Sequence, residues 1–313
     1  MNDRWCKASA PGKFVILGEH AVVYGKPAVV LAVDMRMTIS VRESKFNTIN
    51  GDKIDFRRQP HLRYLTRNTR HAIDIRTSSA IPVGSGLGSS AALSAAMALA
   101  LDELHNGSMT EAELVEEAYG AELFAQGIGS PMDASACVHG GGIAVNLPET
   151  QDRHLWTVER GERRWSVSDV DVPDMTFVIG NTGIRAPTGP LVDKVRRFIN
   201  HSSFATDVIN DIEDVTIEGS KALAKNDVEA LGRLMTEDHK LLSILGVSGT
   251  ELNKLVNAAL PYSYGAKLTG AGGGGCMIAL TDEPDKVCKA IETRGGKAYV
   301  VKTGVPGAML HPI

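Results

Sequence analysis

The chain has 313 residues, of which 43% are hydrophobic and 22% charged, and a formal net charge of −4. This length suits one large or two moderate domains, and the mixed, slightly acidic charge argues against a nucleic-acid-binding protein. The N-terminus has no apolar run that could act as a signal peptide, and the most apolar stretch, 91–101, is too short to span a bilayer. We therefore expect a cytoplasmic protein that contacts no membrane. Its four cysteines are widely spaced with no C-x-x-C pair, which excludes the usual zinc spacing and argues against a disulfide scaffold: Cys6, Cys137, Cys276 and Cys288.

Short apolar runs separated by turns fill the first eighty residues. They predict strands over 13–17, 28–33, 37–41 and 73–77. Because the connections are short, antiparallel pairing suits these strands better than a parallel sheet, which needs long crossovers.

Two helices are predicted next. Residues 90–104 are rich in Ala, Leu and Met and contain neither Gly nor Pro. Thr110 and Glu113 form a T-x-x-E capping box that opens a second helix, which Gly127 should close. A strand over 143–147 follows.

The second half of the chain begins with a polar segment, 151–174, which we predict to be the region between two domains. Because strands and helices come in blocks, we predict an α+β protein with an N-terminal domain over 1–170 and a C-terminal domain over 171–313. The predicted elements of the second domain are a strand over 175–180, helices over 191–199, 208–224, 227–245 and 251–259, and a Gly-rich hairpin over 267–280.

A glycine-rich loop before the first long helix is the candidate phosphate-binding site. Glycines let backbone N–H groups approach an anion, and the helix that follows directs the positive end of its dipole at it. No G-K-[ST] follows, so this is not a Walker A loop. The alternative is a flexible turn. The loop reads Pro82-Val83-Gly84-Ser85-Gly86-Leu87-Gly88-Ser89-Ser90.

A second glycine-rich segment, 267–275, contains G-x-G-x-x-G in the sequence K-L-T-G-A-G-G-G-G. A dinucleotide site would need a helix after it and an acid about twenty residues on. A strand follows instead, so a dinucleotide site is rejected. Ordering so many glycines is entropically costly, which favours a close approach to a ligand or to another loop.

A third segment, 11–25, is a strand with polar groups at both ends: P-G-K before the apolar run and G-E-H after it. Glu19 and His20 are candidate ligand-binding residues. For such a pair the alternative is ordinary strand-end polarity or a buried, hydrogen-bonded histidine.

Taken together, these three segments resemble the mevalonate kinases, particularly the short archaeal ones. These belong to the superfamily of galactokinases, homoserine kinases, mevalonate kinases and phosphomevalonate kinases (GHMP kinases). P-G-K-x-x-x-x-G-E-H-A-V-V-Y-G is similar to the first signature, P-x-G-S-G-L-G-S-S-A-A to the ATP-phosphate loop and K-L-T-G-A-G-G-G-G-C to the third motif. They occur in family order across essentially the whole chain. The resemblance implies an N-terminal domain like ribosomal protein S5 domain 2, a ferredoxin-like C-terminal domain and an active site in the cleft between them.

The resemblance also implies Mg²⁺-dependent transfer of the ATP γ-phosphoryl group to the 5-hydroxyl of mevalonate, giving 5-phosphomevalonate and ADP in isoprenoid biosynthesis. Asp133 falls where the family has its catalytic aspartate, and Lys13 would lie close to it and to the substrate. Glu122 and Ser90 match the Mg²⁺-binding residues, and two protein oxygens suffice because water and ATP phosphates complete the octahedron. The alternatives are an exposed helical acid for Glu122 and a helix cap for Asp133.

Further residues are assigned by the same resemblance. Lys13, Glu19, His20, Thr188 and Arg196 would bind mevalonate, with Arg196 pairing with its carboxylate; an exposed helical arginine is the alternative for Arg196. Pro187 and Pro190, which flank Thr188, depart from the family pattern. The expected ATP-binding residues are Pro82, Gly84, Ser85, Gly86, Leu87, Gly88, Ser89, Ser90, Ala91, Gly272 and Gly273.

Three other functions remain open. A kinase for phosphomevalonate would need extra basic residues in the acceptor pocket, and a kinase for homoserine or a sugar would share the fold. A decarboxylase of this fold would lose part of G-E-H-A-V-V-Y-G, which is intact. A non-catalytic metabolite sensor would be expected to lose Asp133, Lys13 or the metal ligands, all of which are present. The family also leads us to expect a homodimer.

Overall fold

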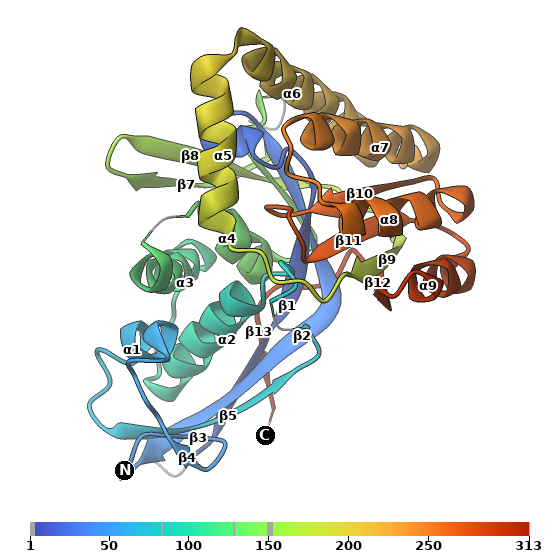
Figure 1. The fold of residues 1–313 in the computed structure, drawn as a ribbon. Coiled ribbons are helices and arrows are strands. Elements are labelled where there is room, and N and C mark those ends of the chain that lie inside the picture. Colours follow the sequence, from blue (N-terminus) through green and yellow to red (C-terminus); the bar gives the residue numbers. More distant parts are fainter. Residues whose placement is uncertain (1–3, 83, 128, 149–152, 313) are drawn as a thin grey trace.

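The protein folds into two layered units of helices and sheet, shown in blue to green and in yellow to red in Figure 1. This computed structural model describes residues 4–82, 84–127, 129–148 and 153–312. Residue 83 of the predicted phosphate loop and residues 151–152 of the predicted polar segment lie outside this part. Among the described residues, no helix combines the length and the apolar character needed to cross a bilayer.

The first unit is built on a sheet whose central strands are long and antiparallel. Strand β2 pairs with β1 along one edge; its other edge pairs with β6 near its start and with β5 near its end. The short C-terminal strand β13 pairs with the start of β1. The strands are β1 (Cys6–Leu17), β2 (Ala28–Ser44), β3 (Thr48–Ile49), β4 (Asp52–Lys53), β5 (Ala72–Ser79), β6 (Gly142–Val145), β7 (His154–Arg160), β8 (Arg163–Val170) and β13 (Met309–His311).

Strand β2 corrects one prediction, since residues 28–33 and 37–41 belong to one continuous strand. The register with β1 shifts between Pro11 and Gly12, so the pair bends at a bulge without breaking. Arg36, in the bend, donates hydrogen bonds to Ser9 and to the carbonyl of Gly307. Those bonds hold the bend and the chain end together.

Two of the helices of the first unit, α2 and α3, confirm predictions, and two more, α1 and α4, were not predicted. Helix α2 buries a row of small side chains against β1 and β2. Helix α3 has the predicted capping box, in which Thr110 N donates to Glu113 Oε2 at 2.8 Å, and Gly127 ends it with φ +76°. The helices are α1 (Pro60–Leu65), α2 (Ser89–Leu104), α3 (Glu111–Gln126) and α4 (Met132–His139), with a 3₁₀ turn at Ala21–Tyr24.

The polar segment predicted to separate the domains is instead the β7–β8 hairpin of the first sheet. Its buried residues, Trp156, Val158, Trp165 and Val167, occupy alternate positions of the two strands, and its charged residues gather near the turn at 159–164. This period of two puts one apolar face on the core, and the high charge of the other face hid the strands. The prediction of a linker over most of this segment was therefore wrong.

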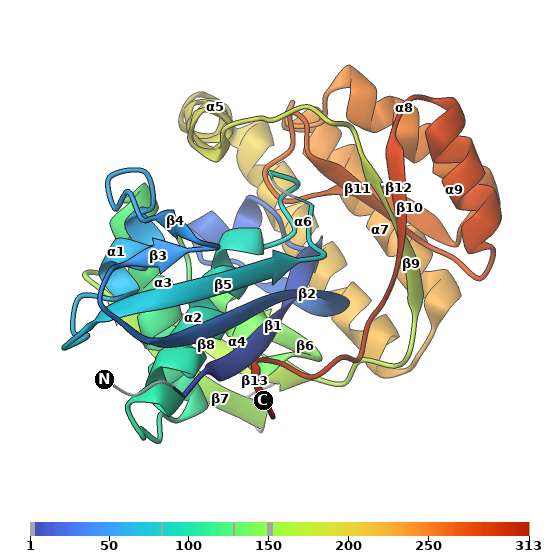
Figure 2. The ribbon, with the colours of Figure 1, turned by 90° about the horizontal axis from the view of Figure 1, so that it is seen from below.

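The second unit is a four-stranded antiparallel sheet in the order β10-β11-β9-β12 with helices packed around it (Figure 2). The predicted Gly-rich hairpin is confirmed as β10–β11. The strands are β9 (Thr176–Asn181), β10 (Gly265–Thr269), β11 (Cys276–Leu280) and β12 (Lys297–Lys302). The helices are α5 (Thr188–His201), α6 (Ser203–Ala224), α7 (Val228–Ile244), α8 (Thr250–Ala259) and α9 (Pro284–Thr293), with a 3₁₀ turn at Leu260–Tyr262.

The two units share a packed boundary. The rings of Phe14 and Phe177 lie 4.9 Å apart, and Lys26 pairs with Glu213 of α6 at 2.5 Å. Because β13 returns to the first sheet, the chain end lies beside β1 (Figure 1). The predicted boundary at residue 170 falls between β8 and β9 and stays a prediction. All four cysteines are free thiols.

Candidate active site

The predicted phosphate loop wraps over the start of α2. Gly88 is the residue before the helix, with φ +73°, and a Cβ there would lie 2.8 Å from Cγ of Lys13. Only glycine lets the lysine pass beneath this turn. The described residues give the first turn of α2 no side-chain cap. Its backbone N–H groups and the positive end of its dipole are thus available to an anion.

Lys13 joins this loop to the predicted catalytic acid. Its ammonium lies 3.0 Å from Asp133 Oδ2 and donates to the carbonyl of Gly86 at 3.1 Å. The lysine side chain is 4% exposed and the aspartate side chain 39%. The acid is therefore fixed by a buried cation and still open to a small molecule.

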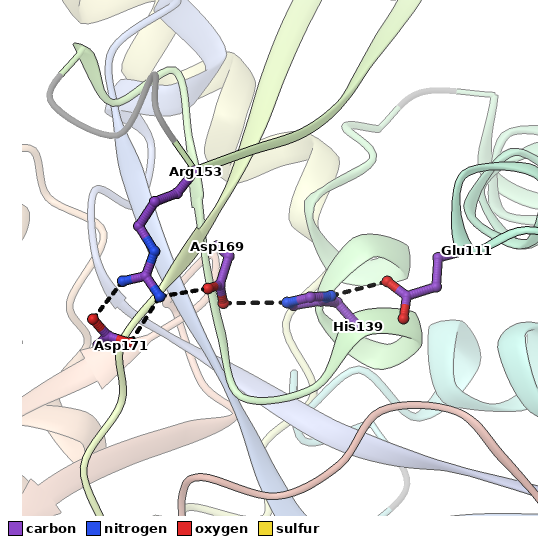
Figure 3. Close-up of polar contacts among 5 residues, drawn as sticks. All are labelled: Glu111, His139, Arg153, Asp169 and Asp171. Atoms are coloured by element: carbon purple, nitrogen blue, oxygen red, sulfur yellow. Dashed lines mark hydrogen bonds and ion pairs between the residues drawn. The ribbon is translucent and has the colours of Figure 1, made fainter.

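Helix α4, which carries Asp133 in its first turn, is anchored at its other end by a polar chain (Figure 3). His139 lies 2.9 Å from Glu111 Oε2 and 3.2 Å from Asp169 Oδ1. Arg153 bridges Asp169 and Asp171. These contacts of His139 connect α4 to α3 and β8, and so they fix the position of the helix that carries Asp133.

The two predicted metal ligands meet between α2 and α3. Ser90 Oγ donates to Glu122 Oε2 at 3.0 Å, and Gln126 donates to the same oxygen at 2.9 Å. The other oxygen, Oε1, is buried and lies 3.0 Å from His61 Nε2, but no described residue hydrogen-bonds it with good geometry. A buried carboxylate oxygen with unused lone pairs fits a cation. No group of three or more His, Cys, Asp or Glu side chains among the described residues is arranged to hold a metal, so the protein would supply few ligands.

The third motif lies against the phosphate loop, which is the close approach to another loop that its glycines favour. A Cβ at Gly275 would be 3.3 Å from the Ser85 carbonyl oxygen. The glycine amides are partly used internally, since Gly273 N donates to Val247 O and Gly275 N to Ile184 O. ATP contacts by Gly272 and Gly273 remain predictions.

Arg185 is a candidate that sequence reasoning missed. A Cβ at Gly84 would lie only 2.9 Å from its Nε, so the side chain crosses the phosphate loop from the second unit. Within the described part of the chain, its guanidinium has no hydrogen-bond or ion-pair partner. The sequence shows only that Arg185 is a cation in the loop after β9. Nothing in the sequence indicates that this side chain lies against Gly84. His61, beside Glu122, was missed for the same reason.

The Gly-Glu-His corner lies at the boundary of the two units. His20 is 6% exposed, its backbone has φ +62°, and its Nε2 lies 2.9 Å from the Ala271 carbonyl oxygen. Burial lowers the pKa of this ring. Glu19 is 3% exposed and pairs with Lys267, so its carboxylate is directed into the protein. This contact differs from the predicted role of Glu19 at the mevalonate hydroxyls.

Thr188 and Arg196 lie on α5, which stands at one side of the site (Figure 2). Thr188 begins the helix. Arg196 pairs with Asp193 at 2.6 Å, and its side chain is 62% exposed. Burial raises the pKa of Tyr24, and the charge of Arg196 opposes this rise. The contact of Arg196 with substrate stays a prediction.

Comparison with known proteins identifies the family. Residues 58–141 match the GHMP kinases N terminal domain, and residues 220–297 match the GHMP kinases C terminal domain. The chain belongs to the GHMP kinases. It is similar to a GHMP kinase named mevalonate kinase from Methanothermobacter thermautotrophicus, with 34% identity over 285 residues covering 87% of this chain and 89% of that one. The prediction of the superfamily is confirmed.

Solved structures confirm the fold. The chain superposes on L. major mevalonate kinase in complex with R-mevalonate with a TM-score of 0.82 and 22% identity, covering 95% of each chain. It also superposes on Lactococcus lactis galactokinase complexed with galactose with a TM-score of 0.76 and 19% identity, covering 98% of this chain and 95% of that one. The two-domain α+β GHMP fold is as predicted. Because kinases of different acceptors share it, the fold alone does not select the acceptor.

Proposed function

We propose that this GHMP kinase transfers the γ-phosphoryl group of ATP to the 5-hydroxyl of mevalonate, giving 5-phosphomevalonate and ADP for isoprenoid biosynthesis. The observation that carries the chemistry is the Lys13–Asp133 pair, 3.0 Å apart at the mouth of the phosphate loop. The acceptor is proposed from the similarity to a curated mevalonate kinase along nearly the whole chain.

Asp133 would accept or orient the proton of the acceptor hydroxyl. Its half-open side chain can contact a substrate while the buried ammonium of Lys13 holds one oxygen in place. As the hydroxyl attacks, negative charge grows on its oxygen, and Lys13 is close enough to stabilise it. Phosphoryl transfer depends mainly on such positioning and charge stabilisation.

The triphosphate would lie along 84–90, with its charge facing the first turn of α2. Mg²⁺ would be held by Ser90 and Glu122, with ATP phosphates and water as the remaining ligands. A bound Mg²⁺ neutralises charge on the phosphoryl oxygens during transfer. The buried Oε1 of Glu122, to which none of the described residues donates a hydrogen bond of good geometry, supports this assignment.

The acceptor would lie between the Gly-Glu-His corner and α5. His20, neutral because burial lowers its pKa, can hydrogen-bond a hydroxyl, and Arg196 offers a cation for the carboxylate. Thr188 at the start of α5 would add a hydroxyl contact. A hydroxy acid such as mevalonate matches this combination of a neutral ring and a cation.

The test is ADP release from purified protein with Mg-ATP and, in separate reactions, mevalonate, phosphomevalonate, homoserine and galactose. Turnover with mevalonate alone supports the proposal. Turnover with another acceptor would keep the reaction and reject the acceptor. Tight ATP binding without any turnover would favour a metabolite sensor.

We also propose that the protein is a cytoplasmic homodimer. The four free thiols are consistent with a reducing compartment, and the dimer rests on the family resemblance alone. Light scattering of the purified chain at several concentrations would give its mass, and a monomer at all of them would reject the dimer.

A further inference from the structure

Three ionisable side chains are buried together where the two units meet. Lys267 of β10 and Asp238 of α7 have exposures of 0%, and Glu19, just after β1, has 3%. The lysine pairs with Glu19 and lies 3.1 Å from Asp238 Oδ2. Buried charges are costly unless they are paired, so a cluster with two acids and one base needs a physical explanation.

The hydrogen bonds of the cluster show an excess of acceptors. Glu19 Oε2 and both carboxylate oxygens of Asp238 are buried, and no donor of good geometry reaches them from the described residues. Glu19 and Asp238 both pair with the single ammonium of Lys267, so two carboxyl groups share one buried cation. One proton shared between the two carboxyl groups leaves a single negative charge, which balances the single positive charge of Lys267.

The surroundings favour keeping that proton. Burial raises the pKa of Glu19 to about 8, against the opposing effect of Lys267, and burial also raises the pKa of Asp238. The facing histidines are neutral near pH 7, because burial lowers the pKa of His20 and lowers that of His239 to about 4. Among the residues that the structure describes, Lys267 is the one cation that forms an ion pair with Glu19 or Asp238.

The cluster is continuous with the acceptor side of the site. Glu19 precedes His20, whose ring contacts the Ala271 carbonyl in the glycine loop that follows Lys267. The residue after Lys267 donates its N–H to His239 Nδ1 at 3.2 Å. His239 Nε2 in turn lies 3.0 Å from Asn253 Oδ1, which fixes the ring. Asp238 is thus linked through Lys267 to Glu19. The strand that carries Lys267 leads into the glycine loop, which contacts His20.

We propose that Asp238 is a positioning residue of the acceptor site: through Lys267 it holds Glu19, and with it the His20 ring, against the glycine loop. Its kinetic consequences rest on the function proposed above, whereas its effect on stability does not. Glu19 is on this view the inner anchor of the corner, and His20 the group that faces the acceptor. Losing the shared proton leaves two carboxylates facing one lysine and loosens the corner.

The pH dependence has a definite sign. A carboxyl group with a folded-state pKa of about 8 and an ordinary value of 4.5 binds its proton more tightly in the folded chain. The stability that this proton provides is complete below about pH 4.5 and is lost as the pH rises through about 8. Replacing Asp238 by Asn removes the need for the proton, because the amide is uncharged and its oxygen can still accept from Lys267.

The experiment compares the wild type with Asp238→Asn, Asp238→Ala and a control, Glu237→Gln, which removes an exposed acid one residue away on α7. Thermal unfolding is followed from about pH 5 to about pH 9. We expect the melting temperature of the wild type and Glu237→Gln to fall across this range relative to that of Asp238→Asn. Kinetically, Asp238→Ala should raise the KM for mevalonate about tenfold at pH 7 with the KM for ATP within about twofold, and Asp238→Asn should restore it.

Two results would overturn the proposal. One is an Asp238→Asn protein whose melting temperature depends on pH as in the wild type, which would show that no proton is shared. The other is an Asp238→Ala protein that is less stable but has an unchanged KM for the acceptor, which would make the residue merely structural. If Asp238→Ala does not fold, the KM of the wild type must still rise above about pH 8 while that of Asp238→Asn stays flat. A wild type without turnover would reject the proposed function, and the unfolding data would still decide whether the proton is shared.

Discussion

Two lysines, each paired with aspartate across a similar distance, have different surroundings in this molecule. Lys13 lies 3.0 Å from Asp133, whose side chain is 39% exposed. Lys267 lies 3.1 Å from Asp238, and both side chains are fully buried. Each pair joins a strand to a helix within one unit, and Lys267 also pairs with Glu19 of the first unit.

The difference in exposure suits the Lys13–Asp133 pair to a chemical role and the Lys267–Asp238 pair to a positioning role. A half-open acid can exchange water for a substrate hydroxyl, so Asp133 is suited to act on a reacting atom. A fully buried pair cannot change partners without a large desolvation cost, so Asp238 and Lys267 can only hold their neighbours. A variant at the open pair should therefore reduce kcat, and a variant at the buried pair should affect KM and stability.

The largest effect is expected for Asp133→Asn. The amide keeps the shape but cannot accept the hydroxyl proton, and we expect kcat for mevalonate to fall roughly 10²–10⁴-fold. ADP release under saturating substrates measures it, with circular dichroism and ATP binding as checks that the fold and the nucleotide site remain. A kcat within a few-fold of wild type would place the chemistry elsewhere and remove the distinction between the two pairs.

Glu122→Gln tests the metal site at the phosphate end. We expect the Mg²⁺ concentration needed for half-maximal activity to rise about 10–100-fold, a change typical of disturbed metal sites. The control is Glu218→Gln, an exposed acid on α6 that is expected to leave the Mg²⁺ dependence unchanged. An unaltered requirement in Glu122→Gln would return Glu122 to the role of an ordinary helical acid.

Arg185→Gln tests whether the second unit contributes to the phosphate end. Because the guanidinium crosses the loop at Gly84, its loss should raise the KM for ATP about tenfold and leave the KM for mevalonate within about twofold. Arg233→Gln, an exposed arginine on α7, is the matched control. A rise in the KM for mevalonate alone would move Arg185 to the acceptor side.

The region of the Lys13–Asp133 pair was largely predictable from the sequence, and the buried cluster around Lys267 was not. The glycines of the phosphate loop lie in a short contiguous motif that predicts anion binding, whereas the roles of Lys13 and Asp133 came from the family resemblance. Helix α3 was predictable because its capping box and closing glycine are local signals. Such features depend on neighbours a few residues apart.

The buried cluster could not be predicted, because its partners are far apart in the chain: Lys267 and Glu19 are separated by 248 residues. Asp238 occurs in E-D-H-K on an amphipathic helix, where an acid normally faces water. Only the packing of α7 against β10 makes it buried. The β7–β8 hairpin was missed for a related reason, since burial of one face of a charged segment is decided by the sheet it joins.

The smallest effect is expected at the acceptor end, for Arg196→Gln. The side chain is 62% exposed and paired with Asp193, and exposed charge contacts contribute at most about 1 kcal/mol, so the KM for mevalonate should rise only about threefold to fivefold. The adjacent Arg197 is also exposed, which makes Arg197→Gln a control of equal charge on the same helix. If both variants behave alike, general electrostatic attraction explains the effect, and Arg196 has no specific contact with the carboxylate. If only Arg196→Gln responds, the open acceptor side binds through weak, exposed contacts and depends on the buried cluster for its shape.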